Sequence, residues 1–260
     1  MTFLQQTLGK NYKWWYIFKY YLKYDYMLGN AIFHWVFGNI FYTFSFVFLW
    51  SYVVKNNELA IYALVGAIFA RLTGSWMSWS IADNIRTGKI NKNLLSTTSI
   101  FGLHFVTSIA RPMAESFLLI SVLSISGNII FGLKFDFQNL VFLIPLVLIG
   151  SFINFCINSL LGYLAFWEEN MGSLITMFDN IFPILSGGFI PLIALPFYEY
   201  TKFNPFAYFV HNPTQIYLGK YDNVQILQTF AGGLTWCIAL WILARLVFKA
   251  GLKKNEAVGL

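Results

Sequence analysis

The sequence is poor in charged residues and in cysteine. Asp, Glu, Lys and Arg make up 11% of its 260 residues, whereas soluble domains carry roughly 25%. Hydrophobic residues make up 58%, and the mean hydropathy is +0.61, so lipid is the expected solvent for most of the chain. The two cysteines, Cys156 and Cys237, both fall in apolar stretches, which argues against a disulfide framework or a metal site.

Motifs for nucleotide binding and catalysis are also missing. The Gly-Lys pairs at 9–10, 88–89 and 219–220 lack the earlier glycine of a phosphate-binding loop. The three histidines are scattered without metal-ligand spacing, and there is no Gly-x-Ser-x-Gly nucleophile turn. We therefore expect that this chain is not an enzyme and holds no cofactor or metal.

Long apolar runs dominate what remains. About 20 apolar residues cross a bilayer, and six runs reach that length: 28–54, 60–82, 104–131, 140–165, 172–195 and 225–248. Before them, residues 10–24 place Trp and Phe on one helical side and lysines on the other, as expected of a helix that lies at the lipid surface. We predict one all-α membrane domain over residues 1–260, with six transmembrane helices and an N-terminal interfacial helix.

The distribution of positive charge predicts the orientation. Alternate sides of the membrane receive eleven and four Lys or Arg residues, and the richer side is cytosolic in most membrane proteins. The net charge of +6 therefore indicates topology, and no nucleic-acid partner is expected. This assignment predicts a multi-pass protein of the cytoplasmic membrane, with both termini and the loop 83–99 in the cytosol and the segment 196–224 outside.

Prolines break the segment that leads into the last span. Five of the seven prolines fall between 183 and 213, where each prevents a continuous helix, yet the pieces between them are aromatic and apolar. Such a sequence favours short helices that re-enter the outer leaflet before the last span.

Ionisable residues within the predicted spans are candidates for function, because insertion costs about 2.5–3.5 kcal/mol each. Arg71 and Asp179 lie about equally deep, so we expect them to pair or to line one cavity. Arg111 and Glu115 stand four apart in the third span and can pair on one helical face. Either pair has two interpretations, mutual neutralisation or a role in transport.

Several motifs occur in an order that carries a family resemblance. The loop 83–99 contains the pattern Ile85-Arg86-x-Gly88-x-Ile90-x-x-x-Leu94-Leu95. It is followed by Ala-Phe-Trp-Glu-Glu at 165–169, Leu-Ser-Gly-Gly-Phe-Ile-Pro-Leu at 185–192, Pro-Phe-Ala-Tyr at 205–208 and Pro-Thr-Gln-Ile-Tyr-Leu-Gly-Lys at 213–220. Across nearly the whole chain this order resembles the six-helix permease subunits of bacterial type-2 ABC exporters.

The resemblance implies a mechanism and a role for specific residues. A coupling helix within 83–99 would dock into a separate ATPase, which carries the ATP and Mg²⁺, and the residues implied there are Ile85, Arg86, Gly88, Lys89, Ile90, Leu94 and Leu95. Re-entrant helices over 187–213 would close the exit, with Gly187, Gly188, Pro191, Pro205 and Phe206 at this outer gate. A substrate path between the second and fifth spans would be faced or bordered by Arg71, Trp76, Trp79, Asp179 and Phe182.

The function implied is ATP-driven efflux of an amphipathic or hydrophobic substrate across the cell membrane, by a dimer with a second permease copy or a related permease. The alternative is an ion-coupled secondary transporter, which typically has paired broken helices in its two halves. We predict helix breaks only near 187–213, with none in the first half, and therefore favour the exporter. For the tryptophans, packing against lipid or a neighbouring helix is an equal alternative.

Overall fold

The computed structural model describes residues 12–27, 29–94, 99–132, 140–195, 198 and 203–258. These residues are helical or irregular, and no strand occurs among them. The α-helices are α2 (Tyr12–Met27), α3 (Gly29–Phe48), α4 (Asn57–Leu72), α5 (Met77–Arg86), α6 (Lys89–Leu94), α7 (Ile100–Phe131), α8 (Leu140–Tyr163), α9 (Met171–Leu185), α11 (His211–Tyr217) and α12 (Asn223–Val258). A π-helical turn, η2 (Leu49–Val53), extends α3, and 3₁₀ turns are η3 (Leu164–Phe166), η4 (Leu192–Ala194) and η5 (Pro205–Tyr208).

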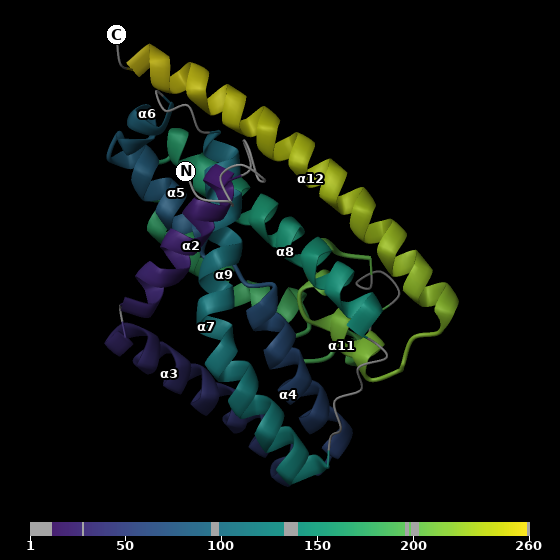
Figure 1. Cartoon of the computed structure of the whole chain (residues 1–260). Coiled ribbons are helices and arrows are strands. Elements are labelled where there is room, and N and C mark those ends of the chain that lie inside the picture. The colour runs from purple at the N-terminus through teal and green to yellow at the C-terminus, as the bar shows by residue number, and fades with distance from the viewer. Residues whose placement is uncertain are drawn as a thin grey trace.

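Helix α8 lies at the centre of the bundle. It packs along α12 and against α5, and Figure 1 shows α12 running the length of the molecule. The largest cluster of buried hydrophobic side chains joins α8 to α4, α12 and the segment around α11, and it includes Phe69, Leu146, Phe155 and Phe209. The all-helical prediction is confirmed.

A second group of helices packs on the other side of α4. Buried side chains of α3, α4 and α7 form a separate cluster that includes Val36, Leu64 and Leu119. Helix α2, which covers most of the predicted interfacial helix, lies against α7. There the Trp14 ring closes over Gly102, where an added Cβ would lie 2.5 Å from the ring.

Four stretches of the described residues have the length and apolar character needed to cross a membrane. They are Val36–Val53, Asn57–Arg86, Val141–Phe166 and Asn223–Lys254, and shorter apolar helices occupy Ile100–Ala110, Leu119–Phe131 and Met171–Leu185. The chain is therefore a multi-pass membrane protein. Arg111 and Glu115 lie in α7, but their side chains are outside the part that the structure describes.

Two of the predicted spans differ from the structure. The predicted span 172–195 is too long, because α9 ends at Leu185 and a turn with Gly187 in the left-handed region (φ +80°) follows it. The predicted span 60–82 lies within the stretch Asn57–Arg86, but its helix is interrupted, since α4 ends at Leu72 and α5 begins at Met77. The expectation of no helix break in the first half of the chain is thus wrong, and the absence of such a break cannot be used against a secondary transporter.

The segment between α9 and α12 folds back into the protein. Its short helices η5 and α11 pack against α8 and α4, and residues 207–216 are all buried. The start of α4 lies nearby, where Lys220 Nζ is 3.4 Å from Glu58 Oε2. We call this the α11 end of the bundle, and the opposite end, with α6 and the last turns of α12, the α6 end (Figure 1).

Candidate functional site

A cavity of about 390 Å³ lies among α3, α4, α8 and α9. Four residues of the predicted substrate path line it: Arg71, Trp76, Asp179 and Phe182. Arg71 and Asp179 come from different helices and line the same cavity. Of the two expectations for them, pairing or lining one cavity, the structure shows the second. The fifth residue, Trp79, borders the site through a hydrogen bond from its Nε1 to Asp179 Oδ2, with the two atoms 3.3 Å apart.

One side of the cavity is polar. The guanidinium of Arg71 donates a hydrogen bond to the Asn39 side-chain oxygen on α3. Asn154 and Asn158 of α8 also line the cavity, and Asn158 donates to the Asn154 side-chain oxygen over 2.6 Å. Because an exposed amide or guanidinium is costly in lipid, this concentration of polar groups marks a site suited to a partly polar ligand.

The other side of the cavity is aromatic. Phe178 and Phe182 of α9 line it, and the Phe182 ring stacks on Phe209 with centroids 4.9 Å apart. Phe206, a predicted gate residue, lies 5.9 Å from Phe182 between ring centroids. The predicted path and the predicted gate therefore meet in one aromatic cluster.

The break between α4 and α5 forms part of the cavity wall, through Gly74, Ser75 and Trp76. A helix end inside a membrane protein leaves carbonyl oxygens that need donors. Side chains of neighbouring helices supply them here. Ser116 of α7 donates to Arg71 O over 3.3 Å, Ser151 of α8 donates to Leu72 O over 3.3 Å, and Asn154 donates to Thr73 O over 2.8 Å.

Replacing Asn154 with leucine should lower the free energy of unfolding by about 1–3 kcal/mol, because the buried Thr73 carbonyl loses the Asn154 donor and the Asn158 amide keeps only the backbone oxygen of residue 154 as its acceptor. The free thiols of Cys156 and Cys237 provide the readout, since a thiol-reactive dye labels them as the protein unfolds on heating. Asn180→Leu, at an exposed position of α9, is the matched control. An unchanged midpoint in Asn154→Leu would show that the break does not depend on this bond.

A polar cluster fixes the turn after α9. The Tyr62 hydroxyl donates to Gly187 O over 3.0 Å and lies 3.1 Å from His211 Nδ1. The other ring nitrogen of His211 lies 3.5 Å from the Tyr198 hydroxyl. Burial lowers the pKa of His211 to about 4, so the ring is neutral at pH 7 and joins α4 to α11 without a charge.

The predicted gate residues lie around this cluster. A Cβ at Gly187 would lie 2.9 Å from the Tyr62 hydroxyl, and its backbone is left-handed, so glycine is required there. Gly188 lines the cavity. Pro191 precedes η4, and Pro205 begins η5. All five predicted gate residues thus lie in the segment between α9 and α11, next to the cavity or in its lining.

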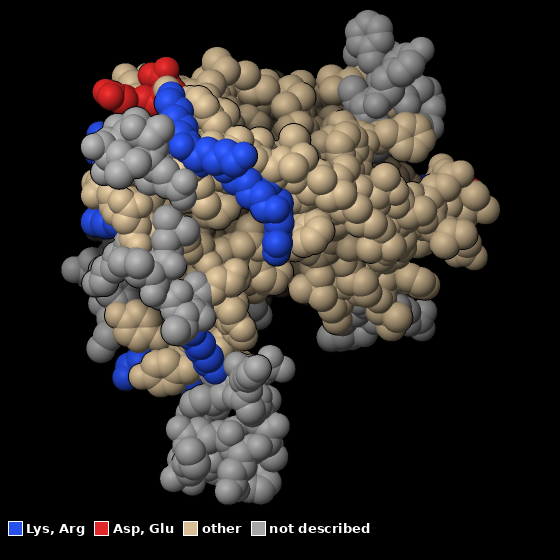
Figure 2. Space-filling model, turned by 90° about the horizontal axis from the view of Figure 1, so that it is seen from above, with Lys and Arg blue, Asp and Glu red and all other residues tan. Residues whose placement is uncertain are grey.

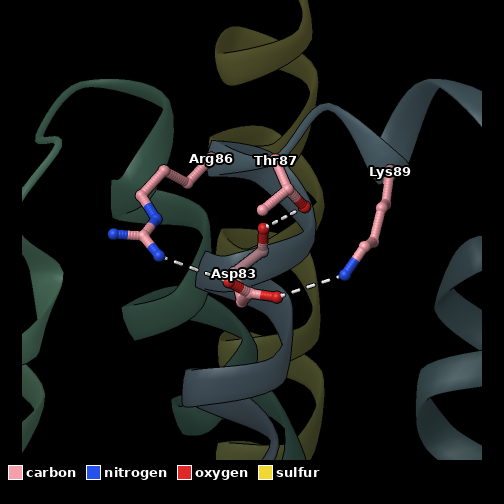
Figure 3. A network of polar contacts seen from close by, with 4 residues as sticks. All are labelled: Asp83, Arg86, Thr87 and Lys89. Atoms are coloured by element: carbon pink, nitrogen blue, oxygen red, sulfur yellow. Dashed lines mark hydrogen bonds and ion pairs between the residues drawn. The ribbon is translucent and has the colours of Figure 1, made fainter.

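The predicted coupling residues lie at the α6 end. Asp83 Oδ1 is 3.5 Å from Arg86 Nη2, Asp83 Oδ2 is 3.6 Å from Lys89 Nζ, and the Thr87 hydroxyl donates to the Asp83 carbonyl oxygen over 2.7 Å (Figure 3). Exposed ion pairs of this kind contribute little stability. In the structure both cationic side chains lie beside the Asp83 carboxylate.

The coupling segment combines exposed and buried residues. Arg86, Gly88 and Lys89 are exposed, whereas Ile85 and Ile90 are buried in a cluster with α8 and α12. The two isoleucines therefore hold α6 on the protein and do not offer side chains to a partner. Leu94 ends α6, with its side chain outside the described part, and Leu95 lies outside the described residues.

Charged side chains of both signs lie on the surface near this end. Figure 2 shows a stripe of Lys and Arg across the face seen from above, with Asp and Glu side chains at one corner. Glu168 and Glu169, which follow η3, are exposed. Such a face suits an aqueous partner with charges of both signs.

Sequence reasoning missed Asn39, Ser75, Asp83 and Asn154. Two sequence signals point to Ser75 and Asn154, and none singles out Asn39 or Asp83. Thr-Gly-Ser at 73–75 is a run of turn-forming residues inside an apolar stretch, and Asn154 stands four residues before Asn158, so that two amides share one face of an apolar helix.

The family described as ABC-2 family transporter protein matches residues 56–259, which include the cavity helices from α4 onward, the coupling segment and the α11 end. No curated protein matches the sequence. No group of three or more His, Cys, Asp and Glu side chains that could hold a metal ion occurs among the described residues.

Proposed function

Because the chain belongs to the ABC-2 family of transporter proteins, and is thus an ABC transporter permease, we propose that it exports an amphipathic or hydrophobic molecule across the cytoplasmic membrane. ABC transporter permeases work with an ATPase subunit. In our proposal that subunit binds ATP and Mg²⁺, and this chain has neither a cofactor nor an enzymatic activity of its own. The family match over residues 56–259 carries the proposal.

We further propose six transmembrane segments within one domain, residues 1–260. They are α3 with η2, α4 with α5, α7, α8, α9 with the turn after it, and α12. Helix α2 lies in the membrane interface, where Lys13, Lys19 and Lys23 are exposed and suit anionic headgroups. The segment 187–213 re-enters the outer leaflet, which its burial against α4 and α8 supports. Both termini are cytosolic, by the excess of Lys and Arg on that side.

The cavity supports a substrate path between the second and fifth segments. Its wall contains the break after α4, and α5 continues from that break to the exposed corner at Arg86 and Lys89. α5 is therefore a direct route by which a movement of an ATPase docked at α6 reaches the cavity. A second permease, identical or related, completes the transporter.

Transport and ATP hydrolysis must be linked in both directions, so a substrate should change the rate of ATP turnover. In the purified complex, we expect Arg71→Gln and Asp179→Asn to reduce turnover stimulated by amphipathic compounds by about tenfold or more, since a hydrogen bond to a charged group contributes roughly 1.5–3 kcal/mol. Turnover is measured in lipid nanodiscs over a panel of such compounds.

Arg245→Gln and Asp222→Asn are the matched controls. Arg245 lies over the Trp241 ring, 4.7 Å from its centroid, and Asp222 accepts from Gln225 N at the start of α12, both away from the cavity. Equal stimulation in all four variants would reject the cavity as the substrate path.

A further inference from the structure

Helix α5 begins beside the cavity, inside the apolar bundle. The first amides of any helix lack intrahelical acceptors, and the N-cap residue of α5, Trp76, gives no side-chain cap. Ser75 directly precedes it and lines the cavity. Ser75 is 8% exposed, and its hydroxyl oxygen is buried without a hydrogen-bond partner among the described residues.

The end of α4 and the start of α5 differ in whether their polar groups have hydrogen-bond partners. The carbonyls of Arg71, Leu72 and Thr73 accept hydrogen bonds from side chains of α7 and α8. The unpartnered hydroxyl of Ser75 lies on the α5 side. A helix N-terminus carries about half a positive charge, and it attracts anions through its free amides.

We propose that the start of α5, with Ser75 and the positive charge of Arg71, binds the anionic oxygen group of the transported amphiphile, a carboxylate or a phosphate. This inference rests on the proposed function and specifies its substrate class. Arg71 ends α4 on the other side of the break and lines the same cavity. Charge-assisted hydrogen bonds to an oxyanion are about twice as strong as neutral ones, and half-helix N-termini in membrane transporters bind anionic groups in this way.

The rest of the cavity restricts what accompanies the anionic group. Phe46, Phe178 and Phe182 offer apolar surface to the body of the ligand. Asp179 also lines the cavity, and its carboxylate is turned toward Trp79. The Asp179 carboxylate disfavours negative charge on the part of the ligand that lies along α9, so the substrate has one anionic headgroup on an apolar body.

The test compares two fluorescent probes that differ only in charge, 11-(dansylamino)undecanoic acid and its primary amide. Both are titrated into the complex with its ATPase in phosphatidylcholine nanodiscs. We expect the acid to bind about tenfold more tightly than the amide. Ser75→Ala and Arg71→Gln should bring this ratio near one. Ser75→Thr, which restores a hydroxyl, and Ser80→Ala, an exposed serine on the same helix, should keep it.

Equal binding of acid and amide to the unchanged protein, or no binding of either, would overturn the proposal. So would a tenfold ratio that persists in both Ser75→Ala and Arg71→Gln. Such results with the ATPase still bound leave the proposed function intact, whereas loss of the ATPase from the unchanged complex counts against that function alone.

The same assay identifies the source of the anionic group. Displacement of the acid by phosphatidylglycerol in the nanodisc would support the anion site with a lipid headgroup as its ligand. Displacement by free decanoate or decyl phosphate alone would support it with a soluble amphiphile.

Discussion

Replacing Gly88 with valine should abolish co-purification of the ATPase and ATP-driven transport, while the membrane domain stays folded. Gly88 has φ +70° in the turn between α5 and α6, a conformation that costs other residues about 1–2 kcal/mol and β-branched residues more. A Cβ there meets no atom within 4 Å, so the strain lies in the backbone conformation, and relieving it changes the direction in which the chain enters α6. The amount of ATPase retained by the tagged protein is the measurement.

Gly219→Val is the control for this result. Gly219 has φ +66° and open space around it, but it lies between α11 and α12, at the other end of the molecule. Both variants should lose similar thermal stability, and Gly88→Val alone should lose the ATPase. If Gly219→Val lost it to the same degree, the effect would be general destabilisation and the coupling role of the 83–99 segment would be refuted.

Replacing Gly150 with alanine should lower the thermal midpoint strongly. A Cβ at Gly150 of α8 would lie 2.5 Å from the backbone oxygen of Tyr208 and 3.1 Å from the Thr73 side chain. The buried backbone at Tyr208 and the chain at Thr73 cannot move away freely. Overpacking of this kind lowers the free energy of unfolding by about 1–3 kcal/mol. The same labelling of Cys156 and Cys237 on heating measures it.

For Gly38→Ala, which is also a glycine-to-alanine change, we expect no decrease in the thermal midpoint. Gly38 lies within α3, with no atom within 4 Å of an added Cβ, and alanine is the better helix former by about 1 kcal/mol. Its midpoint should stay the same or rise. Equal thermal midpoints for Gly150→Ala and the unchanged protein would mean that α8 and η5 lie further apart than in the structure.

The sequence predicted the elements that depend on local apolar pattern. α8 at 140–163 and α12 from 223 lie close to the predicted spans 140–165 and 225–248. Each contains an apolar run long enough for composition to define the span, although α8 carries Asn154 and Asn158 and α12 continues beyond the predicted span to Val258. The family resemblance, which rested on the order of motifs, is confirmed by the family match.

The elements that depend on contacts distant in sequence could not be predicted this way. The break at 73–76 is satisfied by Ser116, Ser151 and Asn154, which lie more than 40 residues further along the chain. Apolar residues continue on both sides of Thr-Gly-Ser at 73–75, so mean hydropathy over a long window indicates a single span. Likewise, the burial of Ile85 and Ile90 depends on the packing of α5 and α6 with α8 and α12, which no local pattern reveals.

The central claim is that this permease is driven by a separate ATPase docked at α6. The most direct test is purification of the tagged protein from its own membranes in mild detergent, with the bound chains identified by mass. The account predicts an ATP-binding subunit in stable complex, retained by Gly219→Val and lost from Gly88→Val, together with any second permease. A pure permease without an ATPase, even after chemical cross-linking in the membrane, would contradict it.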